Sequence, residues 1–258
     1  MRIVISSGHG LYVRGASGVI DEVDEARRVT NRVAEILRRE GVNVDAFHEN
    51  SARTATNNVN AIIQHHNRQV RDLDVSIHFN STAAGFIEDR PIGVEVLHFT
   101  GNQNTRALAG RVAKAISDAS GLVLRHRQDS GAVARNNIGF LNNTTAPAIL
   151  VEVCFVVSRA DTRLYLQYFE EICMAIASSI SGRNISAPPE PPTAPPPPPP
   201  IPEPPPPSGS KPSEWAREAW AWGVANSLTD GSSPQGVPTR EQMVTLLYRY
   251  DRLRLTET

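Results

Sequence analysis

The feature that most constrains how this 258-residue chain folds is a proline-rich segment over residues 187–212, which contains 16 of the 20 prolines. Proline fixes φ and lacks a backbone N–H, so such a segment forms neither helix nor sheet. We expect it to run as a solvated polyproline II spacer, roughly 80 Å long when extended. The chain should therefore consist of a domain over residues 1–185, a linker over 186–212 and a small module over 213–258.

Residues 1–185 alternate between short apolar runs and amphipathic segments, a pattern typical of an α/β fold. In the segment 24–40, for example, apolar residues recur at helical spacing until Gly41 ends the helix. The pattern predicts one three-layer domain with a central, mostly parallel twisted sheet and helices on both faces. Strands are expected at 2–6, 42–47, 74–79, 93–99 and 148–155, and helices at 24–40, 56–68, 105–120 and 161–181.

Residues 213–258 predict a small all-α module with one helix near its start and a second over 240–253, separated by a Leu-Thr-Asp-Gly turn at 228–231. All three tryptophans, Trp215, Trp220 and Trp222, lie in the first helix. So short a module is marginal for a core of its own. We expect the tryptophans to form that core, with a ligand-binding or self-association surface as the alternative.

Charge and hydropathy exclude some classes of protein. A formal net charge of −1 gives no general attraction to nucleic acid or anionic membranes. No window is apolar enough for a membrane span, and the N-terminus lacks the pattern of a signal peptide, so we expect synthesis as a cytosolic polypeptide. Cys154 and Cys173 lie in apolar segments and are predicted to be buried free thiols.

Two histidines lie where predicted strands end. His9 follows the first strand, and His78 is near the end of the strand 74–79. Ligands bind at strand ends in α/β sheets, so these imidazoles are candidates to converge with a carboxylate as a catalytic zinc site. Hydrogen-bonded structural histidines are the alternative. Four acids before the first long helix are candidates for the oxygen ligand: Asp21, Glu22, Asp24 and Glu25.

Glu152 lies alone among apolar residues in the predicted strand 148–155. A carboxylate in a buried strand is unfavourable without a partner, so this position indicates a functional residue, unless it faces solvent at the strand's end.

Four motifs occur in order along the first domain: Gly-His-Gly at 8–10, EVDEARRVTNRVAEILRREGVNV at 22–44, DVSIHFNS at 74–81 and PAILVEVCFVVSRAD at 147–161. In order and spacing they resemble the zinc-dependent N-acetylmuramoyl-L-alanine amidases of the amidase 3 type. The resemblance implies one Zn²⁺, held by His9, Glu22 and His78, and a catalytic Glu152. Glu22 is preferred to Glu25 because its distance to Gly41 fits the family pattern. The loop after His9 is shorter than in many family members.

The resemblance implies hydrolysis of the amide between N-acetylmuramic acid and L-alanine in bacterial peptidoglycan. Zinc would make its bound water more acidic, and Glu152 would carry the proton to the leaving amine. We expect a phage endolysin that reaches the wall after release. A host sporulation or autolytic amidase is the alternative with the same chemistry. A wall-binding protein with an inactive enzyme domain and a zinc carboxypeptidase acting on the peptide stem are alternatives of other kinds.

Two further residues are candidates for substrate contacts: Asn80, two positions after His78, and Arg135, in an expected loop. Residues 228–231 and the Thr-Arg-Glu at 239–241 resemble a single surface-layer homology repeat. That resemblance implies binding to a secondary cell-wall polymer or self-association through 213–258. Structural or solvated roles are expected for the remaining histidines, His48, His65, His66, His98 and His126.

Overall fold

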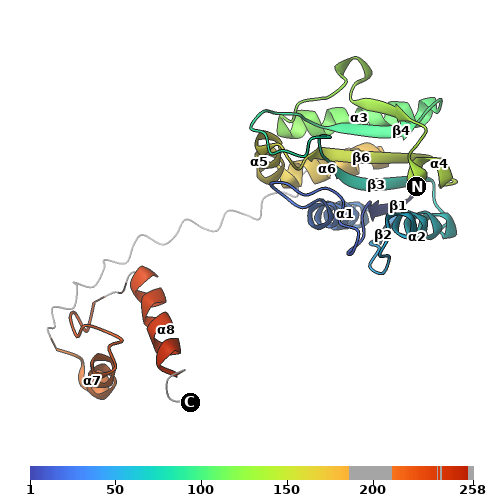
Figure 1. Cartoon of the computed structure of the whole chain (residues 1–258). Coiled ribbons are helices and arrows are strands. Elements are labelled where there is room, and N and C mark those ends of the chain that lie inside the picture. Colours follow the sequence, from blue (N-terminus) through green and yellow to red (C-terminus); the bar gives the residue numbers. More distant parts are fainter. Residues whose placement is uncertain (186–210, 237, 239, 255–258) are drawn as a thin grey trace. The chain divides into compact units, whose positions relative to one another are not determined.

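The computed structural model describes residues 1–185, 211–236, 238 and 240–254 (Figure 1). Contacts divide the chain into two units, Met1–Pro188 and Pro189–Thr258. The predicted linker lies outside the described residues, apart from 211 and 212.

The first unit is built on a six-stranded sheet with the order β2-β1-β3-β6-β4-β5. Neighbouring strands are parallel except β4 and β6, which are antiparallel, so the predicted mostly parallel sheet is confirmed (Figure 1). The strands are β1 (Arg2–Ser7), β2 (Asn43–Phe47), β3 (Leu73–Asn80), β4 (Glu95–Phe99), β5 (Ala132–Arg135) and β6 (Ala148–Phe155).

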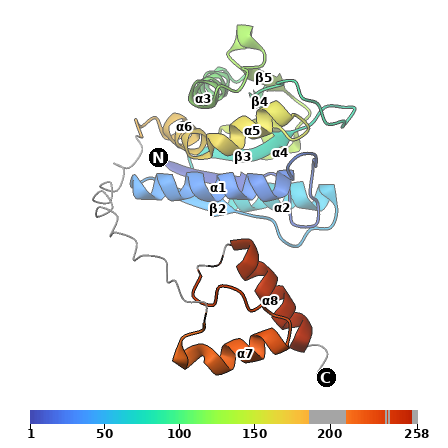
Figure 2. The ribbon, with the colours of Figure 1, turned by 90° about the vertical axis from the view of Figure 1, so that its left-hand side faces the viewer.

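Helices cover both faces of this sheet, as predicted. The larger apolar core joins the sheet to α1, α3 and α6, and a smaller core joins it to α2 and α4. Figure 2 shows α1, α5 and α6 along one side. The helices of this unit are α1 (Glu22–Arg39), α2 (Ala55–Arg68), α3 (Gln103–Ser120), α4 (Gly139–Asn143), α5 (Arg159–Gln167) and α6 (Phe169–Ser181), with a 3₁₀ turn, η1 (Arg127–Asp129).

Alternation along β3 positions the polar residues of the sheet. Side chains of successive residues in a strand point to opposite faces. Leu73, Val75, Ile77 and Phe79 belong to the larger core. The intervening side chains, including Ser76, His78 and Asn80, therefore face the side covered by α2 and α4.

The structure corrects several boundaries. The expected helix over 161–181 is two helices, because Tyr168 leaves helical geometry with φ −113° and ψ 32°. The short β5 and α4 were not predicted, and Arg135, expected in a loop, ends β5. Helix α1 begins at Glu22 because the carboxylate of Asp21 accepts the Val23 N–H as an N-cap.

Cys154 and Cys173 are buried and free, as expected. Among the described residues, no helix has the length and hydropathy to span a membrane.

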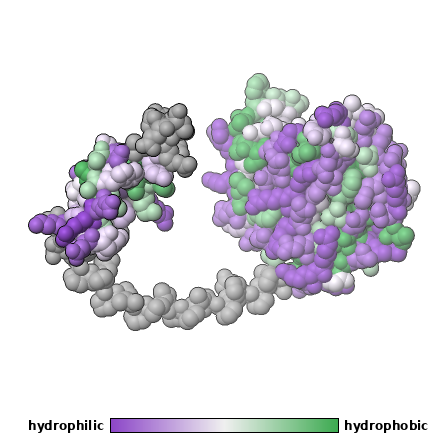
Figure 3. Space-filling view, turned by 90° about the horizontal axis from the view of Figure 1, so that it is seen from below, coloured by the Kyte–Doolittle hydropathy of each residue, from purple (hydrophilic) through white to green (hydrophobic). Residues whose placement is uncertain are grey.

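The second unit contains η2 (Glu214–Ala216), α7 (Arg217–Ala225) and α8 (Arg240–Arg254). The expected tryptophan core is not formed, since Trp215 is 90% and Trp222 is 51% exposed. Among residues 211–236, 238 and 240–250, only Gly223 and Leu228 are buried. Apolar side chains consequently lie at its surface (Figure 3).

Candidate active site

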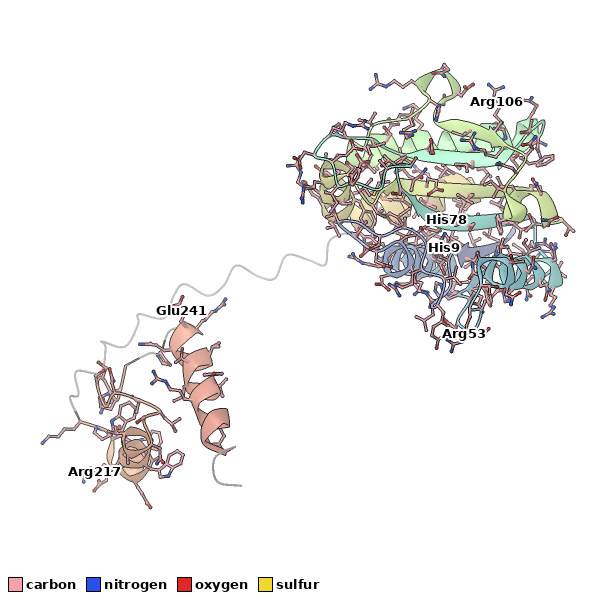
Figure 4. The ribbon with its side chains drawn as sticks, viewed as in Figure 1. His9, Arg53, His78, Arg106, Arg217 and Glu241 are labelled. Carbon is pink, nitrogen blue, oxygen red and sulfur yellow. The ribbon has the colours of Figure 1, made fainter. Side chains whose placement is uncertain are left out.

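Three side chains from separate elements meet at the carboxyl ends of β1 and β3. His9 follows β1, His78 lies near the end of β3, and Glu22 is the first residue of α1. One ligand atom of each lies within 4.8 Å of the others. The imidazole centroids of His9 and His78 are 5.0 Å apart, and the two residues are neighbours in Figure 4.

The Glu22 carboxylate is held between these imidazoles. Its Oε1 lies 3.0 Å from Nδ1 of His78 and 3.5 Å from Nε2 of His9. The backbone N–H groups of Phe79 and Ala16 donate to Oε1 and Oε2 at 3.2 Å and 2.7 Å. Glu22 is thus fixed by both the sheet and the preceding loop.

The other three acids near the start of α1 are engaged elsewhere. Asp21 and Asp24 form ion pairs with Arg14 at 2.6 Å and 2.7 Å. Glu25 accepts a hydrogen bond from the hydroxyl of Tyr165. Of the four candidates, the structure brings only Glu22 to the histidines.

Two glycines leave space for this cluster. A Cβ at Gly8 would overlap the imidazole of His78. Gly15 has φ +70°, and a Cβ there would overlap Oε2 of Glu22 and lie 2.7 Å from Cδ2 of His9. Backbone therefore approaches the cluster where no side chain would fit.

The three residues fit a zinc ion. Nε2 of His9 and Nδ1 of His78 both face Oε1 of Glu22, at 3.5 Å and 3.0 Å. Two imidazoles and one carboxylate, with a coordination position left open, form a common catalytic zinc set.

The pKa values of the cluster reflect burial and mutual charge. Burial lowers the pKa of His9, and nearby His78 lowers it further, which favours the neutral, metal-binding form. Burial alone would raise the pKa of Glu22, but His78, the charge of His9 and the Ala16 N–H together outweigh it, so this pKa is lowered. Burial would lower the pKa of His78, but Glu22 and the charge of Glu152 together outweigh that effect and leave the pKa raised.

Glu152 adjoins the cluster. It pairs with His78 in the register between β3 and β6. Its Oε2 is buried and has no hydrogen-bond partner among the described residues. Burial raises the pKa of Glu152 to about 7, with Glu22 and Glu95 adding to the increase and His78 opposing it. Such a carboxylate can exchange a proton near neutral pH.

A cavity of about 410 Å³ opens beside these groups. His9, His78 and Glu152 lie in its wall. The opposite wall is mostly apolar and comes from α2, α4 and neighbouring residues, including Val59, Ile62, Ile138 and Phe140. The reactive groups thus face a space that can receive part of a substrate.

The two candidate substrate contacts differ in placement. Asn80 lies at the edge of the site, where its Nδ2 donates to Oε1 of Glu95 at 2.9 Å. Arg135 is exposed, and its Nη1 donates to the carbonyl of Ala134. It does not line the cavity.

Sequence reasoning missed Glu95, Arg125 and His126. Glu95 is buried and pairs with Glu152 in the register between β4 and β6. Nε of Arg125 donates to its Oε2 at 2.9 Å, and Nε2 of His126 lies 3.1 Å from the same atom. A lone acid in the apolar segment 93–99 is the same signal that identified Glu152. Arg125 and His126 lie in a loop with no periodic pattern.

A second constellation has the bonding order of a hydrolase triad but cannot serve as one. His66 lies 3.0 Å from the hydroxyl of Ser6 and 2.8 Å from the carboxylate of Asp74. All three are fully buried, so no substrate can reach the hydroxyl. The network joins α2 to β1 and β3, in line with the structural role expected for His66.

Comparisons place these features among known proteins. Residues 3–181 match the family described as N-acetylmuramoyl-L-alanine amidase, amidase 3. An uncharacterized 38.4 kDa protein of Clostridium perfringens is 28% identical over 165 residues, which cover 64% of this chain and 46% of that protein. The chain spans about half the length of the curated relatives that it matches, 46% and 53%.

Solved structures with this fold include two at 25% identity. The catalytic domain of the CD27L endolysin, which targets Clostridia difficile, has a TM-score of 0.60 and is matched over 72% of this chain and 99% of its own. The N-acetylmuramoyl-L-alanine amidase AmiC2 of Nostoc punctiforme has a TM-score of 0.56, over 70% and 96%.

Proposed function

The chain belongs to the N-acetylmuramoyl-L-alanine amidase family, and from that membership we propose that it hydrolyses the amide between N-acetylmuramic acid and L-alanine in bacterial peptidoglycan. The observation that carries the proposal is the cluster of His9, Glu22 and His78, two of which line one cavity together with Glu152. A wall-binding protein with an inactive enzyme domain would not require these four residues to lie together.

We infer that His9, Glu22 and His78 hold one Zn²⁺. When bound, zinc supplies Lewis-acid chemistry, which polarises the amide carbonyl and makes a water molecule more acidic. The hydrogen bonds to Glu22 from Phe79 and Ala16 would orient its carboxylate toward the ion.

Glu152 is assigned as the general base and acid. Its carboxylate takes a proton from the attacking water as the C–O bond forms, and it passes that proton to the amine of L-alanine as the C–N bond breaks. The pKa of Glu152 would fall beside a bound divalent cation, which favours the unprotonated form needed for the first transfer.

Mass spectrometry of digested, purified walls tests the reaction. We expect intact peptide stems that carry a free L-alanine amine. A zinc carboxypeptidase would instead release residues from the other end of the stem. A wall-binding protein with an inactive domain would release neither and would contain almost no zinc.

The biological setting is proposed from the same likeness. The match to an endolysin catalytic domain supports a phage endolysin that acts on the wall after release from the host cytoplasm. A host sporulation or autolytic amidase is the alternative. A holin gene beside the coding sequence would support the phage, and a sporulation operon would support the host.

The second unit is proposed to increase the enzyme's concentration at the wall. Its exposed apolar residues include Trp215, Trp222, Val244 and Leu247. Such a surface suits either a secondary cell-wall polymer or another copy of the unit.

A further inference from the structure

A polar cluster of unassigned function borders Glu152. Its members are Asn80, Glu95, Arg125 and His126, and we call it the Glu95 cluster. Glu95 is 5% exposed and accepts hydrogen bonds from Asn80 and Arg125, while Nε2 of His126 lies 3.1 Å from its carboxylate. One buried carboxylate therefore holds three side chains at the edge of the candidate active site.

The sheet fixes how the cluster lies relative to the reacting groups. His78, Glu152 and Glu95 are successive register partners across β3, β6 and β4. They form one row of polar side chains, with the candidate metal ligand at one end and Glu95 at the other. A substrate whose amide reaches His78 and Glu152 also reaches the Glu95 cluster with the atoms next to that amide.

The Arg125 side chain is held in place by Glu95, and its two Nη atoms remain available as hydrogen-bond donors. Its Nε donates to Glu95, and its guanidinium carbon lies 4.7 Å from the centre of the Phe155 ring. Within the part of the chain that the structure describes, neither Nη atom has a hydrogen-bond partner. The side chain is 32% exposed, so these donors are accessible to a ligand.

The glycan and peptide sides of the scissile amide differ in charge, and this difference indicates which side the Arg125 guanidinium binds. The N-acetylated glycan half carries no charge once its lactyl carboxyl is in the amide. The peptide half carries carboxylates. A planar guanidinium with two free nitrogens is suited to a carboxylate, which it can bind through paired hydrogen bonds.

We propose that Arg125 binds the first free carboxylate of the peptide stem beyond L-alanine, with Glu95 and His126 fixing the orientation of its guanidinium. This specificity-determining role rests on the proposed amidase function. It also orients the substrate, because it places the peptide half over β4 and the loop that follows α3.

Peptidoglycan with free stem carboxylates, before and after carbodiimide-mediated amidation with ammonia, tests the proposal on the full chain. We expect amidation to raise the half-saturating wall concentration of the native enzyme about tenfold, because a charge-assisted hydrogen-bond pair is lost. Arg125→Gln should show the higher half-saturating wall concentration on both the unmodified and the amidated walls.

Arg127→Gln is the matched control. Arg127 is exposed, lies two residues away and makes no side-chain hydrogen bond or ion pair within the described residues, so this variant should behave like the native chain.

The comparison within the native enzyme does not depend on the folding of any variant. Equal half-saturating concentrations on both walls would contradict the binding of a stem carboxylate by Arg125, while the proposed amidase function would still stand. The subsite would also be excluded if folded Arg125→Gln still distinguished the two walls as the native chain does. Failure to cleave the unmodified wall would instead contradict the proposed function on which the subsite rests.

Discussion

At the scale of single residues, the candidate site depends on small features that leave space or hold a charge. Gly8 and Gly15 carry no side chain where one would overlap His78, His9 or Glu22. Phe79 and Ala16 anchor Glu22 through backbone N–H groups. The geometry of the proposed metal site therefore also depends on residues that are not proposed ligands.

Gly15→Ala should abolish stoichiometric zinc binding, because the new Cβ would occupy space beside Glu22 and His9. Gly41→Ala is the matched control, since Gly41 has the same φ of +70° with no atom within 4 Å of an added Cβ. In both variants the free energy of unfolding should fall by about 1 kcal/mol, because alanine is disfavoured in the left-handed backbone region. Metal analysis after dialysis distinguishes them. Full zinc occupancy in Gly15→Ala would show that the space is not needed.

His48 should make the metal-free protein less stable in mild acid. Burial lowers its pKa from 6.5 to about 4, with Arg27 adding to the effect. Between these values the unfolded chain binds a proton that the folded chain does not. Stability therefore falls as pH drops from 6.5 toward 4, by about 1 kcal/mol near pH 5 after allowing for partial exposure.

Urea unfolding in the presence of a chelator at pH 7.5 and pH 5 measures this effect. His48→Gln should lose less stability on acidification than the native chain. An equal loss in both proteins would assign the acid sensitivity to other groups.

At the scale of elements, sequence patterns predict what is long or repeated and miss what is short. Helix α1 and the central strands follow clear periodicities. Strand β5 has four residues and α4 has five, too few for a period to be recognised. The break at Tyr168 was missed because apolar residues continue through it.

The site shows the same division. His9, His78 and Glu152 are identifiable from their positions in strands. Glu22 cannot be chosen among four neighbouring acids by pattern alone, and only the resemblance or the fold selects it. Arg125 cannot be found from sequence. Its contact with Glu95 depends on the loop after α3, and the place of Glu95 opposite Glu152 depends on pairing between β4 and β6.

Asp161 links α5 to the approach to β4, and its loss should destabilise the first unit. The fully buried carboxylate accepts backbone N–H groups of Ile92 and Gly93 at 3.0 Å and 2.7 Å. Asp161→Ala would leave these donors unpaired, at a cost of about 2 kcal/mol in unfolding free energy. Asp118→Ala, at an exposed ion pair, should change stability by less than about 0.5 kcal/mol. Denaturant unfolding compares the two, and equal effects would rule out this role.

At the scale of the whole molecule, the proposed catalytic unit shares one chain with a small unit that exposes several apolar side chains. A chain that ends after residue 188 should cleave soluble muropeptides at the native rate. On intact walls we expect its rate to fall about tenfold, because tethering is lost. Equal rates on walls would exclude a targeting role for the second unit.

Sedimentation of the full chain separates the two explanations for such targeting. Oligomers that dissociate in Leu247→Lys would indicate self-association. A chain that stays monomeric would favour a wall polymer as the partner of the second unit.

The central claim is that His9, Glu22 and His78 hold zinc while Glu152 moves the proton. Zinc content and wall hydrolysis, measured on the same preparation of Glu152→Ala, test it most directly. We expect one zinc per chain, as in the native protein, and hydrolysis reduced by at least about 100-fold, since proton transfer lacks its carrier. Substantial release of stems with a free L-alanine amine by this variant would contradict the role of Glu152.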